Sequence, residues 1–388
     1  MESHLLKAFY FCFYLGIGSM QFLNLYYANF DLSKGEIGIL FAVGPFVMIC
    51  TQPLWGILTD YWERPKFTLF LTLVGSAATV AFFPFSMDFQ HLLILTILYS
   101  FFQSAVSPIA DSTALSLLQD RNDFGKVRLW GSLGYAVGVV SIGRILDFFG
   151  LALMFGLHSG LLICSFIIAI MLPVKKGGKK HFQLKEAVGL LKKPVFIAFL
   201  AFHFILQLTV HANNSFYSIY LETLGANVTL IGIALLIKSI LEIPFFAMST
   251  RLMSRFSYPM LLTIAAAIYS VRWLVLGFSD NLPILIWSQI LLSLSFALQN
   301  FVSVAYVDDM TPKRYRATGQ TMYWTISFGL GGVVGNILAG MALNDIQIPH
   351  MYQMSAFLAA LSILLLWVCP QNEKLKTNLD LEKDGKGV

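Results

Sequence analysis

Charged residues are scarce in this chain: Asp, Glu, Lys and Arg make up only 12% of its 388 residues, whereas 57% are hydrophobic. A soluble domain of ordinary composition is roughly one-quarter charged, and those residues keep its surface hydrated. With half that share, most of the surface must face something other than water, and lipid is the simplest such environment. The 34 phenylalanines further argue against a disordered chain.

Cysteine is also scarce, and the common catalytic and nucleotide-binding motifs are missing. The absence of a P-loop argues against ATP-driven transport by this chain, and the absence of HExxH and GxSxG argues against a membrane enzyme. We therefore expect no enzymatic activity and no cofactor. No cysteine has a partner at CxxC spacing, so we expect no metal or redox site and interpret the four cysteines as small buried hydrophobic residues: Cys12, Cys50, Cys164 and Cys369.

Long apolar runs are what the sequence has instead. Each is roughly 18 to 28 residues long, enough to cross a bilayer as a helix. A helix satisfies its own backbone hydrogen bonds in lipid, whereas a β-barrel would need short alternating segments. The first run lacks an A-x-A-like cleavage site, so we expect a helix there rather than a signal peptide. The twelve runs lie at 9–30, 37–58, 67–86, 91–118, 128–148, 152–172, 195–220, 229–250, 259–278, 283–307, 317–343 and 349–370.

The basic residues are distributed unevenly between the two sides of these runs. With the N-terminus in the cytoplasm, all but Lys34, Arg144, Lys238 and Arg272 of the 26 Lys and Arg residues fall on the cytoplasmic side. This asymmetry predicts a multi-pass protein of the cell (inner or plasma) membrane with both termini cytoplasmic. The net charge of +5 is therefore explained by the basic residues of the cytoplasmic loops, and we expect no nucleic-acid partner.

An internal repeat divides the chain into two halves. Ile37-Gly38-Ile39 recurs as Ile231-Gly232-Ile233, and Trp130 and Gly138 recur as Trp324 and Gly332, all at an offset of 194. The one long loop between runs is rich in Lys and Gly, as expected of a linker. We predict an all-α membrane protein of twelve transmembrane helices in two pseudo-symmetric six-helix bundles. The expected parts are an N-terminal bundle at 1–172, a cytoplasmic central loop at 173–194, a C-terminal bundle at 195–370 and a cytoplasmic tail at 371–388.

Two motifs carry a resemblance to a known family. Residues 56–66 read GILTDYWERPK, which resembles the loop 2–3 signature G-x-L-x-D-x-x-G-R-[RK] of the major facilitator superfamily, although Tyr61, Glu63 and Pro65 depart from it. The resemblance implies that Gly56 lets helices approach closely, that Asp60 pairs with a basic residue or helix end, and that Arg64 holds a cytoplasmic gate.

The second motif is more specific. Residues 124–132 read FGKVRLWGS, which is similar to the [YF]-G-K-V-R-x-W-G-S segment of the phenylpropionate-permease-like group, relatives of lactose and nucleoside proton symporters. This resemblance implies a proton-coupled symporter that moves a small organic solute (an aromatic acid, nucleoside or sugar) by alternating access. Asp111 and Arg128 are interpreted as an ion pair that breaks when the inward gate opens, or alternatively as a fixed packing pair.

The presence of ionisable residues inside the apolar runs requires an explanation, because a charge in the bilayer core costs several kcal/mol. Lys238 and Glu242 are one helical turn apart and share a face, and Arg272 on the next helix is close enough in the topology to join them. We predict that Glu242 couples protons or binds solute, with the two basic residues tuning it; the alternative is a static buried cluster. His211 is expected to relay protons or bind solute, or else to bond across helices.

Amide and aromatic side chains recur on the helices expected to face a central cavity. Such a lining suits a hydroxylated ring or an aromatic acid, although each residue alone could equally form an interhelical hydrogen bond. The predicted cavity-lining residues are Asn24, Tyr27, Gln103, Gln207, Asn214, Tyr217, Gln299, Asn300 and Trp324.

Two other functions stay open. A proton-driven efflux antiporter is one, although the fifth run has no proline and therefore lacks the Gly-Pro ending of the drug-antiporter motif. A non-transporting receptor or scaffold is the other. The expected partners are a small solute, protons and the lipid bilayer, and we expect a monomer.

Overall fold

The computed structural model describes residues 2–30, 32–62, 64–118, 124–173, 193–311 and 316–368. Within these ranges, twelve helical spans are long and apolar enough to cross a membrane, which confirms the prediction from the apolar runs. The largest shift of a boundary is at the first span, which begins at Ser3 rather than at residue 9. Most of the predicted central loop and the predicted tail lie outside the described residues.

The first half of the chain folds into one group of helices, which we call the N bundle. Helix α1 packs against α6 and α7, α4 packs against α5 and α7, and α3 packs against α5. Its elements are α1 (Glu2–Ser19), the 3-10 helix η1 (Met20–Phe22), α2 (Leu23–Ala28), α3 (Lys34–Trp62), α4 (Pro65–Ala81), the 3-10 helix η2 (Phe83–Phe85), α5 (Phe89–Leu117), α6 (Phe124–Phe149) and α7 (Leu153–Met171).

The second half folds into a similar group, the C bundle. Helix α10 packs against α15 and α12, α12 packs against α9, and α8 packs against α14 and α15. A π-helical segment, η6, interrupts the span that ends with α14. The elements are α8 (Pro194–Thr223), α9 (Val228–Met253), α10 (Tyr258–Phe278), α11 (Leu282–Trp287), α12 (Gln289–Met310), α13 (Arg316–Tyr323), η6 (Trp324–Leu330), α14 (Gly331–Ala342) and α15 (Ile348–Val368).

Local sequence sets several helix ends. The Asp88 side chain accepts a hydrogen bond from the His91 backbone N–H at the start of α5, and Asn227 does the same for Leu230 at the start of α9. Proline at the first turn begins α4, α8 and α10, where its missing N–H costs nothing. These signals place the short turns, so the apolar runs stack side by side.

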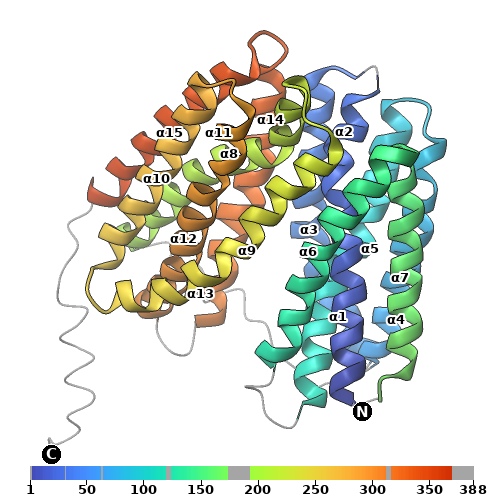
Figure 1. Ribbon diagram of the computed structural model, residues 1–388. Helices are drawn as coiled ribbons and strands as arrows, with labels where there is room; N and C mark the ends of the chain where they lie inside the picture. The colour runs from blue at the N-terminus through green and yellow to red at the C-terminus, as the bar shows by residue number, and fades with distance from the viewer. Residues whose placement is uncertain are drawn as a thin grey trace, which may run out of the picture.

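The two bundles stand side by side and meet closely at the end away from the termini (Figure 1). Helix α3 crosses α14 and α6 crosses α9. The repeated glycines Gly38 and Gly232 lie at these two crossings: a Cβ added at Gly38 would overlap Gly340 and the Asn336 carbonyl, and one at Gly232 would overlap the Val139 carbonyl. The 194-residue offset therefore relates equivalent contact points between the halves.

Hydrogen bonds close this end of the interface. The Asp147 carboxylate of α6 accepts from the backbone N–H groups of Val228 and Thr229, both at 2.8 Å, at the start of α9. The Asn344 side-chain oxygen accepts from the Gly35 N–H at 3.1 Å. These contacts, and those that Asn24 and Asn336 make between the bundles, lie in the half of the interface away from the start of α1. We call this region the sealed end.

The outer surface of the bundles is apolar. Phe46, Ile57 and Phe148 are 56%, 66% and 74% exposed, which suits contact with lipid rather than water. The prediction that the cysteines are buried is wrong for Cys50 and Cys164, which are exposed. The reason is that lipid accepts a small apolar side chain as readily as a protein core does. Cys12 is half-buried, and Cys369 lies outside the described residues.

Candidate functional site

A cavity of about 420 Å³ lies between the two bundles, below the sealed end. From the N bundle, η1, α2, α3 and α6 contribute Met20, Gln21, Asn24, Phe41, Pro45 and Tyr135. From the C bundle, α8, α9, α12 and α14 contribute His211, Asn213, Asn214, Ser215, Tyr217, Ser218, Leu235, Lys238, Gln289, Leu292 and Asn336. The position and size suit a small solute held between two moving halves.

Several residues predicted from the sequence meet at this cavity. Asn24, Asn214 and Tyr217 line it, and so do His211 and Lys238. The amide of Asn24 also crosses the interface, because its nitrogen donates to the Ser215 carbonyl at 3.3 Å. Asn24 of α2 and Asn214 and Tyr217 of α8 therefore face the same cavity from opposite bundles.

Other predicted lining residues are not in the cavity wall. Tyr27 is fully buried and its hydroxyl is 3.0 Å from the Thr96 hydroxyl inside the N bundle. Gln299 is buried beside His203, with 3.1 Å between its amide nitrogen and the ring Nδ1. In both cases the side chain has a hydrogen-bond partner within its own bundle, which is the alternative that the sequence left open.

The remaining predicted lining residues also face elsewhere. Gln207 is fully buried in α8, and Gln103 holds a buried side-chain oxygen in α5; neither group has a partner among the described residues. Trp324 is 42% exposed and stacks on Phe328 at a ring distance of 4.3 Å within the π-helical segment. Asn300 is half-buried in α12, outside the cavity.

The sequence prediction missed polar residues that do line the cavity, above all Gln289, Asn336 and Tyr135. Asn336 joins three helices, because its nitrogen donates to the Phe41 carbonyl at 2.9 Å and its oxygen accepts from the Ser215 hydroxyl at 2.9 Å. A signal was present, because Gln289 and Asn336 are amides inside hydrocarbon-length apolar runs.

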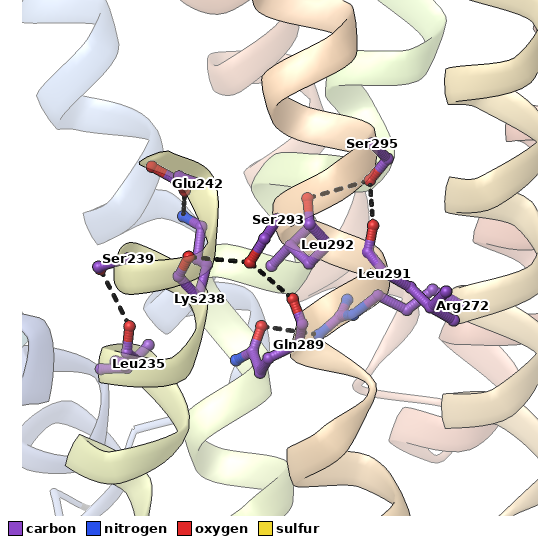
Figure 2. A network of polar contacts seen from close by, with 10 residues as sticks. All are labelled: Leu235, Lys238, Ser239, Glu242, Arg272, Gln289, Leu291, Leu292, Ser293 and Ser295. Carbon is purple, nitrogen blue, oxygen red and sulfur yellow. Dashed lines mark hydrogen bonds and ion pairs between the residues drawn. The ribbon is translucent and has the colours of Figure 1, made fainter. Parts of the chain in front are cut away.

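Lys238 and Glu242 form an ion pair on α9, with 3.7 Å between the ammonium nitrogen and a carboxylate oxygen (Figure 2). Their side chains are 25% and 21% exposed. Tyr135 of α6 lies beside Glu242 across the interface, and the Lys238 ammonium is 5.2 Å from the Phe296 ring centre. The predicted pair is thus present where the two bundles meet, with its lysine at the cavity.

A chain of polar contacts leads from this pair into the C bundle (Figure 2). The Ser293 hydroxyl is 2.8 Å from both the Lys238 carbonyl and the Gln289 carbonyl. The side-chain oxygen of Gln289 in turn accepts from the Arg272 guanidinium at 3.5 Å. The contacts tie α9, α12 and α10 together behind the cavity wall.

Arg272 does not contact the ion pair. The structure therefore does not support the prediction that Arg272 tunes Glu242 by direct contact. Its side chain is fully buried, and it donates to the Asn213 side-chain oxygen at 3.0 Å and the Ser288 carbonyl at 3.2 Å. Its carbon Cζ also lies 4.8 Å from the Trp273 ring centre. Helix α10 turns the arginine toward α8 and α12, away from α9.

His211 lines the cavity from α8, and its ring lies against Gly332 of α14. A Cβ added at Gly332 would be 2.9 Å from the ring Cε1, so the glycine provides the space that the imidazole occupies. Within the described ranges, this ring makes no hydrogen bond. Its nitrogens are therefore available to a solute in the cavity.

The predicted Asp111–Arg128 ion pair is not formed in this structure. The Tyr10 hydroxyl donates to Asp111 at 2.5 Å. The Arg128 guanidinium instead lies 4.2 Å from the ring centre of Tyr14 and 5.8 Å from that of Tyr10. Two tyrosines of α1 therefore stand between the aspartate and the arginine, which the sequence spacing of α5 and α6 could not reveal.

The predicted gating loop is only partly described. Gly56 is exposed and an added Cβ there would meet no atom within 4 Å, so it does not support close helix packing in this structure. The Arg64 side chain is exposed, and that of Asp60 lies outside the described residues. Lys66 has the clearest contact: its ammonium donates to the Ile170 and Leu172 carbonyls, both at 2.6 Å, at the end of α7.

Comparisons with known proteins agree with this architecture. The model of the MFS_1 like family matches residues 4–354. The chain is 29% identical to a maltose permease of Geobacillus stearothermophilus over 94% of each chain. It is 25% identical to a probable 3-phenylpropionic acid transporter of Escherichia coli (strain K12) over 77% of this chain and 80% of that one.

Solved structures show the same fold. The crystal structure of the nucleoside transporter NupG superposes with a TM-score of 0.84 at 18% identity, covering 94% of this chain and 97% of that one. The resemblance noted in the two motifs is thereby confirmed at the level of family and fold. The chain belongs to the MFS_1 like family of the major facilitator superfamily and is a multi-pass membrane transporter of a small solute.

Proposed function

We propose that this transporter is a proton-coupled symporter in which Glu242 carries the proton and Lys238 responds to it. One observation carries the proposal: the Lys238–Glu242 pair stands at the interface of the two bundles, with the lysine lining the cavity. The ammonium nitrogen and a carboxylate oxygen of the pair are 3.7 Å apart.

The pair offers a direct route from proton binding to solute binding. A proton on Glu242 removes its negative charge and releases the Lys238 ammonium, which then donates its hydrogen bonds into the cavity. By linkage, a solute that binds the released ammonium raises the affinity of Glu242 for its proton by the same factor. Solute and proton therefore bind together and leave together, which is the requirement for symport.

Alternating access follows from the two-bundle arrangement in this proposal. The N and C bundles correspond to the predicted domains at 1–172 and 195–370, and they rock against each other as a monomer in the bilayer. With both termini in the cytoplasm, the sealed end faces outward and the structure is closed on that side. Opening it requires the contacts of Asp147 and the crossing at Gly38 to separate.

The solute is a small organic molecule. The relatives by name carry maltose, 3-phenylpropionic acid and nucleosides, and each would fit a wall of amides and aromatic rings. Because 3-phenylpropionate is an anion whereas maltose and nucleosides are neutral, they form a useful set of probes for this chain.

Proteoliposomes test the proposal. An imposed inward pH gradient should drive accumulation of at least one probe (labelled maltose, uridine or 3-phenylpropionate) by the wild type. Glu242→Gln should abolish that accumulation while leaving exchange of the same solute intact. Gradient-driven accumulation by Glu242→Gln equal to wild type would reject the coupling role, and expulsion of solute under the same gradient would favour the efflux antiporter.

A further inference from the structure

Arg272 is a buried cation without an anionic partner. It is fully buried, and no carboxylate of the described residues lies within 4.0 Å of its guanidinium. It donates hydrogen bonds to neutral oxygens, among them the Ser288 carbonyl and the side chains of Asn213 and Gln289. Such an arrangement is costly in an apolar bundle, so the contacts that it makes require an explanation.

The guanidinium fixes the orientation of two amide groups. Arginine has only N–H donors, so Asn213 and Gln289 must both turn their oxygens toward it. The Asn213 oxygen is held a second time, by the Tyr352 hydroxyl at 3.2 Å. Figure 2 shows the Gln289 nitrogen pointing away from Arg272. An amide is free to flip in most sites, but here a flip would place N–H groups against N–H groups.

Both oriented amides belong to the cavity wall. With their oxygens occupied, the groups left for a solute are the N–H donors of Asn213 and Gln289. Tyr217 shares a hydrogen bond with Gln289, and since an amide nitrogen carries two N–H bonds, one remains for a solute. Arg272 therefore fixes the position of two sets of N–H donors in the C bundle wall of the cavity.

We infer that Arg272 is a positioning residue that fixes the hydrogen-bond polarity of this wall, and that the cavity selects an uncharged solute rich in acceptor oxygens. The inference rests on the proposed solute site between the bundles. Arg272 is too enclosed to meet an anion itself, and the amide N–H groups that it orients are neutral. Neutral N–H donors match hydroxyl and ether oxygens, and removing one such hydrogen bond weakens affinity roughly five- to tenfold.

Gln289→Glu tests the polarity directly. The carboxylate keeps an oxygen partner for Arg272, so the fold is retained, but the N–H donor is lost. Purified protein is titrated by thermal shift with maltose and with analogues in which each hydroxyl in turn is replaced by fluorine or by hydrogen. The difference in affinity between the deoxyfluoro and deoxy analogues reports the hydrogen bond, and a change in packing alone would not alter it. Fluorine accepts weakly and cannot donate, so the wild type should bind at least one deoxyfluoro sugar more tightly than the matching deoxy sugar.

In Gln289→Glu that preference should disappear and maltose affinity should fall about tenfold. Arg272→Met, which frees both amides to flip, should also lose the preference if it folds. Gln353→Glu is the matched control, because Gln353 donates to the Gly277 carbonyl at 2.8 Å outside the cavity; its preference should equal that of the wild type.

Two results would overturn the inference. One is an unchanged fluoro-over-deoxy preference in Gln289→Glu. The other is a wild type that is stabilised by 3-phenylpropionate and not by any neutral probe. Neither result bears on proton coupling, which is tested separately by gradient-driven uptake in Glu242→Gln. Failure of this inference and failure of the proposed symport are therefore distinguishable.

Discussion

The two walls of the cavity differ in chemistry. The N bundle contributes mainly shape, through side chains such as Met20, Phe41 and Pro45, with only Gln21, Asn24 and Tyr135 as polar groups. The C bundle contributes the nitrogen-containing ionisable side chains of the wall, His211 and Lys238, and most of its amides and hydroxyls. From this difference we expect the C bundle to contribute more of the solute recognition than the N bundle does.

The largest expected effect would come from blocking that closure. Gly38→Trp places a large ring where α3 crosses α14, a contact too close even for a Cβ. Overpacking a tight contact costs about 1–3 kcal/mol or more, so the sealed end should not re-form and transport should fall by about a hundredfold. Solute affinity, set by the C bundle, should change by less than about threefold.

Counterflow into proteoliposomes measures the transport, and thermal-shift titration measures the affinity. Gly156→Trp is the control, because an added Cβ at Gly156 meets nothing within 4 Å, and its transport should stay near wild type. If Gly38→Trp transports normally, the sealed end does not take part in the cycle.

A pair of alanine substitutions compares the walls themselves. Asn214→Ala removes an amide from the C bundle wall, and Gln21→Ala removes one from the N bundle wall. With one solute hydrogen bond at stake, affinity should fall roughly tenfold for Asn214→Ala and by less than about twofold for Gln21→Ala. The apparent KM for uptake is the measurement. Equal losses on the two sides would contradict the assignment of recognition to the C bundle.

Asp147→Ala should have a smaller effect, on the balance between conformations. The Asp147 carboxylate of the N bundle caps the first turn of α9 in the C bundle, and losing a helix cap costs about 1 kcal/mol. The population open at the sealed end should rise about fivefold. Distances between spin labels on the two bundles would report it.

Asp88→Ala is the matched control for that substitution. Asp88 caps α5 within one bundle, accepting from the His91 N–H at 2.9 Å. Its loss should lower thermal stability by a similar free energy without moving the distance distribution. A shift of equal size in both variants would show that the Asp147 contact has no special role between the bundles.

The smallest expected effect is at Gly56. Because an added Cβ meets nothing within 4 Å, Gly56→Ala should change transport by less than about twofold, as surface substitutions usually lie within about 0.5 kcal/mol. Initial uptake rates are the measurement. A large loss would mean that Gly56 packs closely in another state of the cycle, as the loop motif implies.

The fold could be predicted because its causes are local. Hydrocarbon-length apolar runs specify the spans, and the 194-residue repeat correctly paired Gly38 with Gly232 at equivalent crossings. The Lys238–Glu242 contact could also be predicted, since residues four apart on one helix must share a face. Each of these inferences needed only one helix, or a comparison of the chain with itself.

The rest of the site depends on which face each helix turns toward its neighbours, and a single sequence does not reveal this orientation. Arg272 was expected at Glu242, but α10 faces α8 and α12. Gln299 contacts His203 rather than the cavity. Tyr10 of α1 lies beside Asp111, where Arg128 was expected. A polar residue in an apolar run signals a partner, and only packing shows whether the partner is a neighbour or a solute.

Proton movement during transport tests the central claim most directly. Adding a transported solute to lightly buffered proteoliposomes should make the outer medium more alkaline with wild-type protein, because each solute enters with a proton. With Glu242→Gln, solute exchange should persist and the alkalinisation should vanish. Alkalinisation of wild-type size in Glu242→Gln would contradict the account, because the proton would then travel without the carboxylate that the Lys238–Glu242 pair supplies.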